Sequence, residues 1–359
     1  MNRLRDELNL SSIDVRSWHQ PLMIMTAAMS ALVVVAGVGL FVDGRELMHA
    51  SVWAKPLKFG VSFVMYGATL AWLIPQLSRA RRTMWAVGTL FAVAGLIDVG
   101  FIAVQAARGT YSHFNASTDM FDQIGQRIFQ TGVFGLFGAS LVVAVMLLFQ
   151  RIGNAAFTWS LRAGLGLAVL GMALASFITG SAQSAGPRTV EDAYGNSVPL
   201  VGGHGVGTLD GSGMPITNWS TTGGDLRVPH FISLHSIQLF VLTVLVLTFL
   251  GGRIGWLRRE RVRAQLAGVV IFGYSALFAI TAWQALRGQS LIHPDAATWT
   301  AFAVAAVMTA LLAALVVMAA HRNQRALRAE ATRRSEQVRR ERAARHDERA
   351  LGSKAAPTG

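Results

Sequence analysis

The chain has 359 residues, of which 52% are hydrophobic and only 14% are charged, and its mean hydropathy is +0.43. These values are typical of membrane proteins and exclude an ordinary soluble domain. The net charge of +13 does not indicate nucleic-acid binding, because 11 of the 32 lysine and arginine residues lie in the last 39 positions, where they form a solvated tail. The absence of cysteine excludes disulfides, iron–sulfur clusters and thiolate-ligated haem.

Eight apolar runs are long enough to cross a bilayer, which takes roughly 20 residues. The predicted fold is therefore all-α and integral to the membrane, with two four-helix halves in the same orientation. The eight runs cover approximately residues 22–42, 57–77, 84–107, 128–149, 159–180, 231–250, 265–286 and 299–320. We expect a cytoplasmic amino-terminal segment at 1–20 without a cleavable signal, a first half at 21–150, a second half at 151–320 with a long outer loop at 181–229, and a basic cytoplasmic tail at 321–359.

Basic residues in the connections predict the orientation. If the amino terminus is cytoplasmic, the inner segments hold 23 lysine and arginine residues and the outer segments hold seven. Cytoplasmic loops carry the excess of lysine and arginine in membrane proteins. We therefore expect a multi-pass protein of a bacterial inner (plasma) membrane with both termini in the cytoplasm.

The third and seventh runs end in the same string, Gln-Ala-x-Arg-Gly, at residues 105–109 and 284–288. The second and sixth runs also begin alike, with Pro-Leu-Lys-Phe at 56–59 and Val-Pro-His-Phe at 228–231. Duplicated halves related by an axis along the membrane normal occur in transporters and cofactor-binding proteins. In both strings the arginine lies near the outer surface, where it either anchors the helix or binds an anion.

Histidines gather at the outer side, most notably where the long polar loop enters the sixth run. His235 lies about five residues into that run, and a histidine at this depth is costly unless it is paired or ligating. His293 opens the eighth run, and Asp295 is placed to cap that helix. If a haem lies between histidines of two neighbouring helices, His235 and His293 are the predicted axial ligands. His230 would then lie at the mouth of the site, and Arg287 would be a propionate partner. A structural hydrogen bond is the alternative for His235.

The first half offers a different set of polar residues. Asp98 lies in the middle of the third run, where a carboxyl group is neutral, paired or in a polar channel. Pairing with Lys58 or Arg108 is one possibility. Together with His113 these residues define an alternative ligand site between the two halves.

A third possibility is a zinc-dependent membrane hydrolase. It would use His113, Asp119, His204 and His230 as ligands and acid–base groups. No spacing among them is diagnostic of a metal site, so no metal is predicted.

The long outer loop carries the string GTLDGSGMPITNW at 207–219, followed by Gly223 and Pro229. Together with the eight runs and the Gln-x-x-x-Gly ends at 105–109 and 284–288, this loop resembles the haem A synthase family. The resemblance implies two four-helix halves and a b-type haem held by histidines on the second and fourth helices of a half. By this likeness His235, or His230, and His293 would hold one haem b in the second half.

We therefore expect a polytopic membrane protein that binds haem and has a redox or respiratory-assembly role, with a quinone or respiratory-chain component as partner besides membrane lipid. The alternative is a non-redox transporter or small-ligand-binding protein that uses Lys58, Asp98, Arg108 and His113. Whether the protein is an enzyme, and its oligomeric state, stay open at this point.

Overall fold

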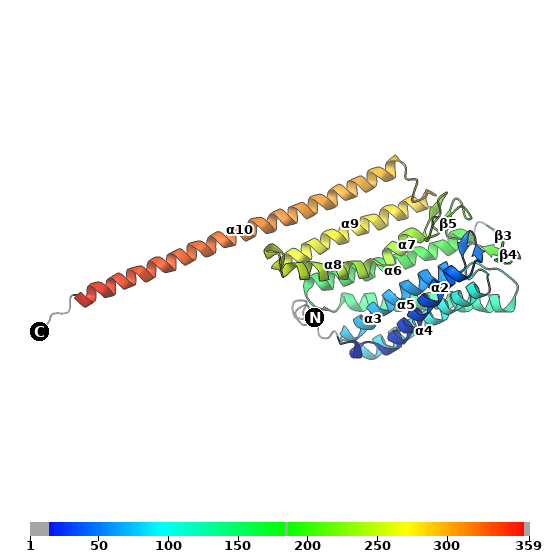
Figure 1. Cartoon of the computed structure of the whole chain (residues 1–359), viewed down its shortest axis with the longest axis horizontal. Coiled ribbons are helices and arrows are strands. Elements are labelled where there is room, and N and C mark those ends of the chain that lie inside the picture. Colours follow the sequence, from blue (N-terminus) through cyan, green and yellow to red (C-terminus); the bar gives the residue numbers. More distant parts are fainter. Residues whose placement is uncertain (1–13, 184–185, 355–359) are drawn as a thin grey trace.

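A computed structural model of the chain describes residues 14–183 and 186–354, and among these eight helices are long and apolar enough to cross a membrane (Figure 1). This confirms the predicted all-α membrane class. The spans are Gln20–Val42 (α2), Ala54–Gln76 (α3), Arg81–Ala107 (α4), Met120–Leu148 (α5), Ala155–Ala175 (in α6, Ala155–Gln183), Arg227–Gly251 (α7, Arg227–Leu234, with α8, Ser236–Gly251), Glu260–Leu286 (α9) and Ala296–Glu341 (in α10, Ala296–Lys354). Residues 1–13 of the expected amino-terminal segment and 355–359 of the tail lie outside the described residues.

The connections contain short elements. Two 3₁₀ helices, η1 (Val15–Ser17) and η2 (Gly255–Arg258), lie outside the spans. Three antiparallel pairs of strands are formed by β1 (Glu46–Leu47) with β2 (Ala50–Ser51), β3 (Pro187–Glu191) with β4 (Ser197–Val201), and β5 (Gly205–Val206) with β6 (Gly224–Asp225). The three strand pairs follow the first or the fifth span and lie at one end of the bundle, which we call the loop end (Figure 1).

The two groups of four spans pack in the same way. In the first half α2 contacts α3 and α4, α3 contacts α4, and α4 contacts α5. In the second half α6 contacts α7, α8 and α9, α7 and α8 contact α9, and α9 contacts α10. The halves meet where α5 packs on α6 and where α3 touches α8. The second helix of each half therefore lies at the interface between the halves.

Helix α5 begins at Met120, eight residues before the expected run at 128–149. Asp119 caps this start by accepting a hydrogen bond of 3.3 Å from the backbone N–H of Asp122. The added turns contain polar residues such as Asp122 and Gln126, whose side chains bond to protein groups at the loop end. Because those partners are supplied within the protein, hydropathy alone placed the helix start too late.

The long loop of the second half reaches over the first half. The backbone N–H of Ala116 donates to the carbonyl of Pro199 in β4 at 2.8 Å, and the Tyr111 hydroxyl donates to the carbonyl of Glu191 in β3 at 2.9 Å. The loop is therefore a packed structure that connects the two halves.

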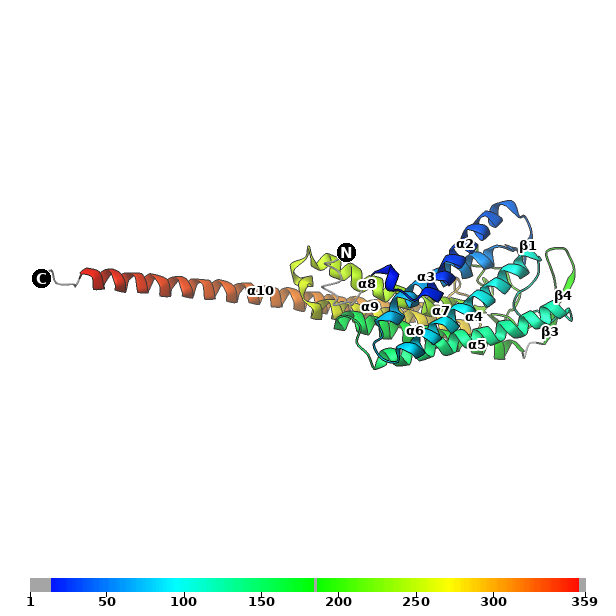
Figure 2. The same ribbon diagram turned by 90° about the horizontal axis from the view of Figure 1, so that it is seen from below.

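Helix α10 runs on well beyond the apolar run expected at 299–320 and projects away from the bundle, opposite to the loop end (Figures 1 and 2). The side chains of residues 326–341 are exposed. The part of the expected basic tail that the structure describes is thus a continuous helical extension of α10.

Candidate functional site

Two lysines lie in the first five residues of α3, at the loop end. The Lys58 ammonium group donates a hydrogen bond of 2.8 Å to the backbone carbonyl of Thr217 in the long loop. The Lys55 side chain makes no hydrogen bond and no ion pair with any residue in the described part of the chain. Both side chains are partly buried. Lys55 therefore brings a positive charge into the protein without a counter-charge of its own.

The corresponding helix of the second half, α7, begins with Arg227. Its guanidinium group donates to both carboxylate oxygens of Asp225, at 2.9 Å and 2.6 Å, and to the backbone carbonyl of Asn218. Asp225 is only 2% exposed, so a buried carboxylate and a partly buried guanidinium form a two-point ion pair. This pair fixes the end of β6 against the start of α7.

Basic residues occupy matching places at the starts of these two helices. Helix α3 carries Lys55, Lys58 and Phe59, and α7 carries Arg227, His230 and Phe231, with the same spacing. The similarity of residues 56–59 to residues 228–231 therefore extends to a longer shared pattern: a basic residue, two other residues, a second basic residue and a phenylalanine. It supplies one basic pair from each half.

The sixth span is interrupted at His235, which separates α7 from α8. His235 Nε2 lies 3.2 Å from the Ser62 hydroxyl of α3, so the side chain joins the two halves by a hydrogen bond. Its Nδ1 is buried and has no partner among the described residues. His230 Nδ1 is 2.8 Å from the carbonyl oxygen of Gly171, and Nδ1 therefore carries the proton.

Two further histidines come from the loops. The ring centroids of His113 and His204 are 6.2 Å apart, and His113 also lies 4.3 Å from the ring of Phe129. Burial lowers the pKa of both histidines well below the usual value, and nearby cations, Lys55 for His113 and Arg227 for His204, lower it further. Both imidazoles are therefore neutral at physiological pH. His204 Nδ1 is buried without a partner in the described chain.

These side chains form one group, which we call the basic cluster. Electrostatic interactions connect Lys55 to Arg227 and Lys58, and connect both histidines of the loops to Lys55. Among the described residues the one carboxylate that interacts with the cluster is Asp225, which is already bonded to Arg227. With neutral imidazoles, neither lysine has a carboxylate partner of its own among the described residues. The members are Lys55, Lys58, His113, His204, Arg227, His230 and His235.

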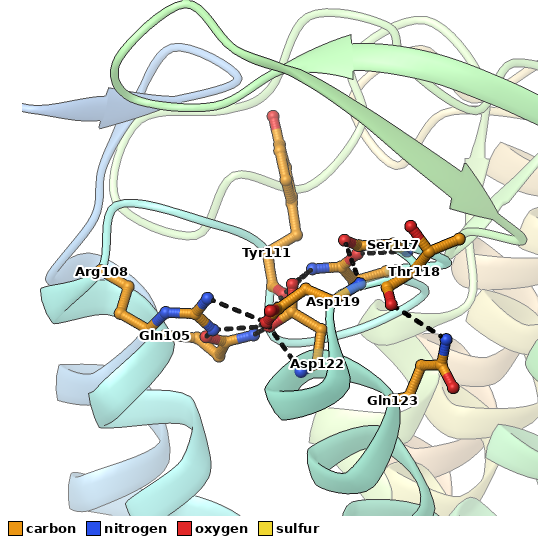
Figure 3. Close-up of polar contacts among 9 residues, drawn as sticks. Gln105, Arg108, Tyr111, Ser117, Thr118, Asp119, Asp122 and Gln123 are labelled. Carbon is orange, nitrogen blue, oxygen red and sulfur yellow. Dashed lines mark hydrogen bonds and ion pairs between the residues drawn. The ribbon is translucent and has the colours of Figure 1, made fainter.

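Arg108 is bound within the protein instead of facing a ligand (Figure 3). Its guanidinium group donates to the Asp122 carboxylate at 2.6 Å, to the Gln105 side-chain oxygen at 2.7 Å and to Asp119 at 3.3 Å. Asp122 is 4% exposed and also accepts from Gln105 Nε2 at 2.7 Å. The network fastens the end of α4 to the start of α5.

Arg287 makes the matching network in the second half. Its guanidinium group donates to Asp295 at 2.8 Å, to the Thr298 hydroxyl at 2.5 Å and to the side-chain oxygen of Gln289 at 3.2 Å. Asp295 accepts from the backbone N–H of Thr298 at 2.8 Å, which confirms it as the cap of α10. Both terminal nitrogens of Arg287 are thus occupied by protein groups.

The structure brings Lys58, His113, His230 and His235 together in the basic cluster. It does not bring His235 and His293 together: His235 faces Ser62 of α3, whereas His293 is exposed before α10, a helix that packs on α9.

Asp98 pairs with neither Lys58 nor Arg108, because both of these have other partners, and neither of its oxygens has a partner in the described chain. Asp119 and Asp122 face Arg108, and in the described residues no three histidine, aspartate or glutamate side chains are grouped to hold a metal ion.

Sequence reasoning did not select Lys55, Arg227 and Asp225. A lysine or arginine at the end of a membrane helix usually extends to the surface, and this common role hid Lys55. A signal was present for the other two: the loop after the first helix of each half contains Asp-x-Arg, at 43–45 and 225–227, and in both copies the arginine bonds to the aspartate.

Searches against protein families, curated proteins and solved structures give no match to this chain.

Proposed function

We propose that this polytopic membrane protein binds a small anion, one that carries carboxylate or phosphate groups, in the basic cluster between its two halves, as a non-redox transporter or ligand-binding protein does. The observation that carries the proposal is Lys55, a partly buried ammonium group without a partner in the described chain, beside Lys58 and Arg227. Neighbouring like charges repel one another strongly in a medium of low dielectric constant. A bound anion relieves that repulsion and supplies the missing counter-charge.

The arrangement of the cluster supports this proposal. Equivalent basic residues come from the second helix of each half, and these helices touch across the interface through α3 and α8. Ligand sites of duplicated membrane proteins lie at such interfaces. If both halves contact the ligand, the relative position of the halves would depend on whether the ligand is bound.

Helix ends add to the positive potential. Both α3 and α7 begin at the loop end. The start of α3 has no side-chain cap in the described chain, whereas the first N–H of α7, that of Arg227, donates to the Asp225 carboxylate at 2.9 Å. The amino-terminal end of a helix carries a partial positive charge and attracts anions. The imidazoles of His204 and His235, each with a buried nitrogen that lacks a partner in the described chain, supply polar contacts for the oxygens of a ligand.

The site belongs to the outer face in this proposal. The excess of lysine and arginine in the segments opposite the loop end supports a cytoplasmic position for these segments and for both termini. The loop end, and with it the basic cluster, then faces outward. The ligand reaches the cluster from outside the cell.

The test is thermal unfolding of the detergent-purified protein at low ionic strength with phosphate, sulfate, acetate, succinate or citrate. A ligand at 100 times its Kd stabilises the folded state by about 2.7 kcal/mol. We expect at least one of these anions to raise the unfolding midpoint, and Lys55→Gln to abolish the increase. Arg322→Gln, which removes an exposed basic residue from the tail, serves as the control. No increase with any carboxylate or phosphate compound contradicts the proposal.

Haem b is the second candidate, favoured by the buried and unpartnered Nδ1 of His235 together with the resemblance of the outer loop to the haem A synthase family. His235 would be one axial ligand, and a quinone or respiratory-chain component would be the partner. The test is the visible spectrum of purified, haem-supplemented protein before and after dithionite. A Soret band that is lost in His235→Ala supports haem, and a featureless spectrum removes this candidate.

A further inference from the structure

Asp98 is a carboxylic acid inside the membrane span of α4 that takes no part in the basic cluster. It is 3% exposed and lies well within the span Arg81–Ala107. Neither carboxyl oxygen has a hydrogen-bond partner among the described residues. An ionised carboxylate without a partner is strongly disfavoured in a medium of low dielectric constant, whereas the protonated form is tolerated.

No charged group on the neighbouring helices compensates Asp98. Helix α4 packs against α2, α3 and α5. Helix α2 contains no titratable residue, α3 contains Lys55, Lys58 and Tyr66, and α5 contains Asp122 and Arg127. Lys58 and Asp122 are bonded elsewhere, the Tyr66 ring stacks on Phe91, and Arg127 is exposed. Lys55 belongs to the basic cluster at the loop end, away from the centre of the span.

Helix α5 provides a space for the carboxyl group. A β-carbon added at Gly132 would lie 2.0 Å from the nearer Asp98 oxygen, so only glycine leaves room for this side chain. The close approach of backbone to carboxyl group shows that α5 is shaped around Asp98. A side chain merely tolerated at a lipid-facing position needs no such space.

An aromatic layer lies one helical turn closer to the loop end. Phe101 of α4 and Phe129 of α5 are three residues from Asp98 and Gly132 respectively, and their ring centroids are 6.3 Å apart. On the other side of this layer the ring of His113 is 4.3 Å from that of Phe129. The buried acid and the nearest imidazole are thus separated by a pair of apolar rings.

We propose that Asp98 is a proton-binding site inside the membrane, protonated when the protein is at rest, and that its proton exchanges with His113 and the loop end past Phe101 and Phe129. The carboxyl group itself lies outside the basic cluster, which the route reaches at His113, and its protonation does not depend on anion binding. A membrane carboxyl group with these properties suits proton coupling, and such residues are functional far more often than structural.

The experiment uses dicyclohexylcarbodiimide, an apolar reagent that attaches to protonated carboxyl groups, on the full-length protein in detergent. At neutral pH we expect mass spectrometry to find the label on the peptide that contains Asp98, and Asp98→Asn to lose it. The peptide that contains Asp119 and Asp122, whose carboxylates are bound to Arg108, is the internal control and stays unlabelled. Absence of label on Asp98 from mildly acidic to neutral pH overturns the proposal.

Infrared spectroscopy provides a second measurement that does not require a reagent to reach the site. The carbonyl stretch of a protonated carboxyl group should be present in the wild-type protein, shift in D₂O, and be missing in Asp98→Asn. Phe129→Ala should speed the shift after transfer to D₂O several-fold, because it opens the aromatic layer. An unchanged rate in a folded Phe129→Ala variant contradicts the route, and a missing band in the wild type contradicts the site.

Discussion

Gln105 of α4 and Gln284 of α9 make the same hydrogen bond in the two halves. Each side-chain Nε2 donates to the backbone carbonyl of the residue six positions later, Tyr111 at 3.3 Å and Ser290 at 2.7 Å. Each glutamine is buried, and each is followed by a glycine with positive φ that ends the helix, Gly109 and Gly288. The likeness of the two strings in the sequence therefore extends to the contacts that they make.

The two arginine networks should differ in their contribution to stability. Arg108→Gln leaves the buried carboxylate of Asp122 without its cation, and we expect a loss of about 1–3 kcal/mol. Arg287→Gln should have a smaller effect, because its partner Asp295 is 44% exposed and water can replace the arginine. Thermal unfolding of both variants in detergent checks the order. An Arg287→Gln variant that is less stable than Arg108→Gln contradicts this account.

The space beside Asp98 leads to a second prediction. Gly132→Ala should destabilise the protein by about 1–3 kcal/mol, because the added methyl group overlaps the carboxyl group. Gly138→Ala, on the same helix, has nothing within 4 Å of the added carbon and should be neutral or stabilising. The double variant Asp98→Ala with Gly132→Ala should recover part of the loss. Equal effects of the two glycine substitutions would show that α5 is not packed against Asp98.

The pH dependence of stability should reflect the buried histidines. The pKa values of His113 and His204 are lowered in the folded protein by burial, so the unfolded chain takes up protons first as the pH falls. Stability from these groups is complete above about pH 6.5, the unfolded pKa, and declines as the pH falls below it. His204→Gln should flatten the decline in unfolding midpoint between about pH 7 and pH 5. A slope identical to that of the wild type would show that His204 does not contribute.

The helical tail should be dispensable for folding of the membrane part. Residues 326–341 are exposed, whereas the His321 ring lies 5.3 Å from that of Trp256 between centroids and Ala320 is buried beside Leu257. A chain that ends at Arg325 should unfold at the wild-type midpoint. Trp256→Ala should cost about 2 kcal/mol, because it removes packing between η2 and α10. A truncated chain that loses as much stability as Trp256→Ala would reveal contacts made by the tail.

The sequence predicts the eight spans because a bilayer requires long apolar helices, and it predicts the cap at Asp295 because helix starts need an acceptor. It could not predict the partners of Arg108 and Arg287. An arginine near the membrane surface is equally suited to a bound anion or to an internal carboxylate, and only the tertiary structure brings Asp122 next to Arg108. Lys55 was missed for the same reason, since the uncompensated charge is a property of its surroundings and not of its spacing.

The most direct test of the central claim is titration calorimetry of the purified protein with the anion that gives the largest thermal stabilisation. The wild type, Lys55→Arg and the control Arg322→Gln should bind it with similar affinity. Lys55→Gln should lose at least tenfold in Kd, which corresponds to about 1.4 kcal/mol, and its anion-free form should be more stable than the wild type because repulsion within the basic cluster is reduced. Equal affinity of Lys55→Gln and the wild type, in protein that remains folded, would contradict the assignment of the basic cluster as the anion site.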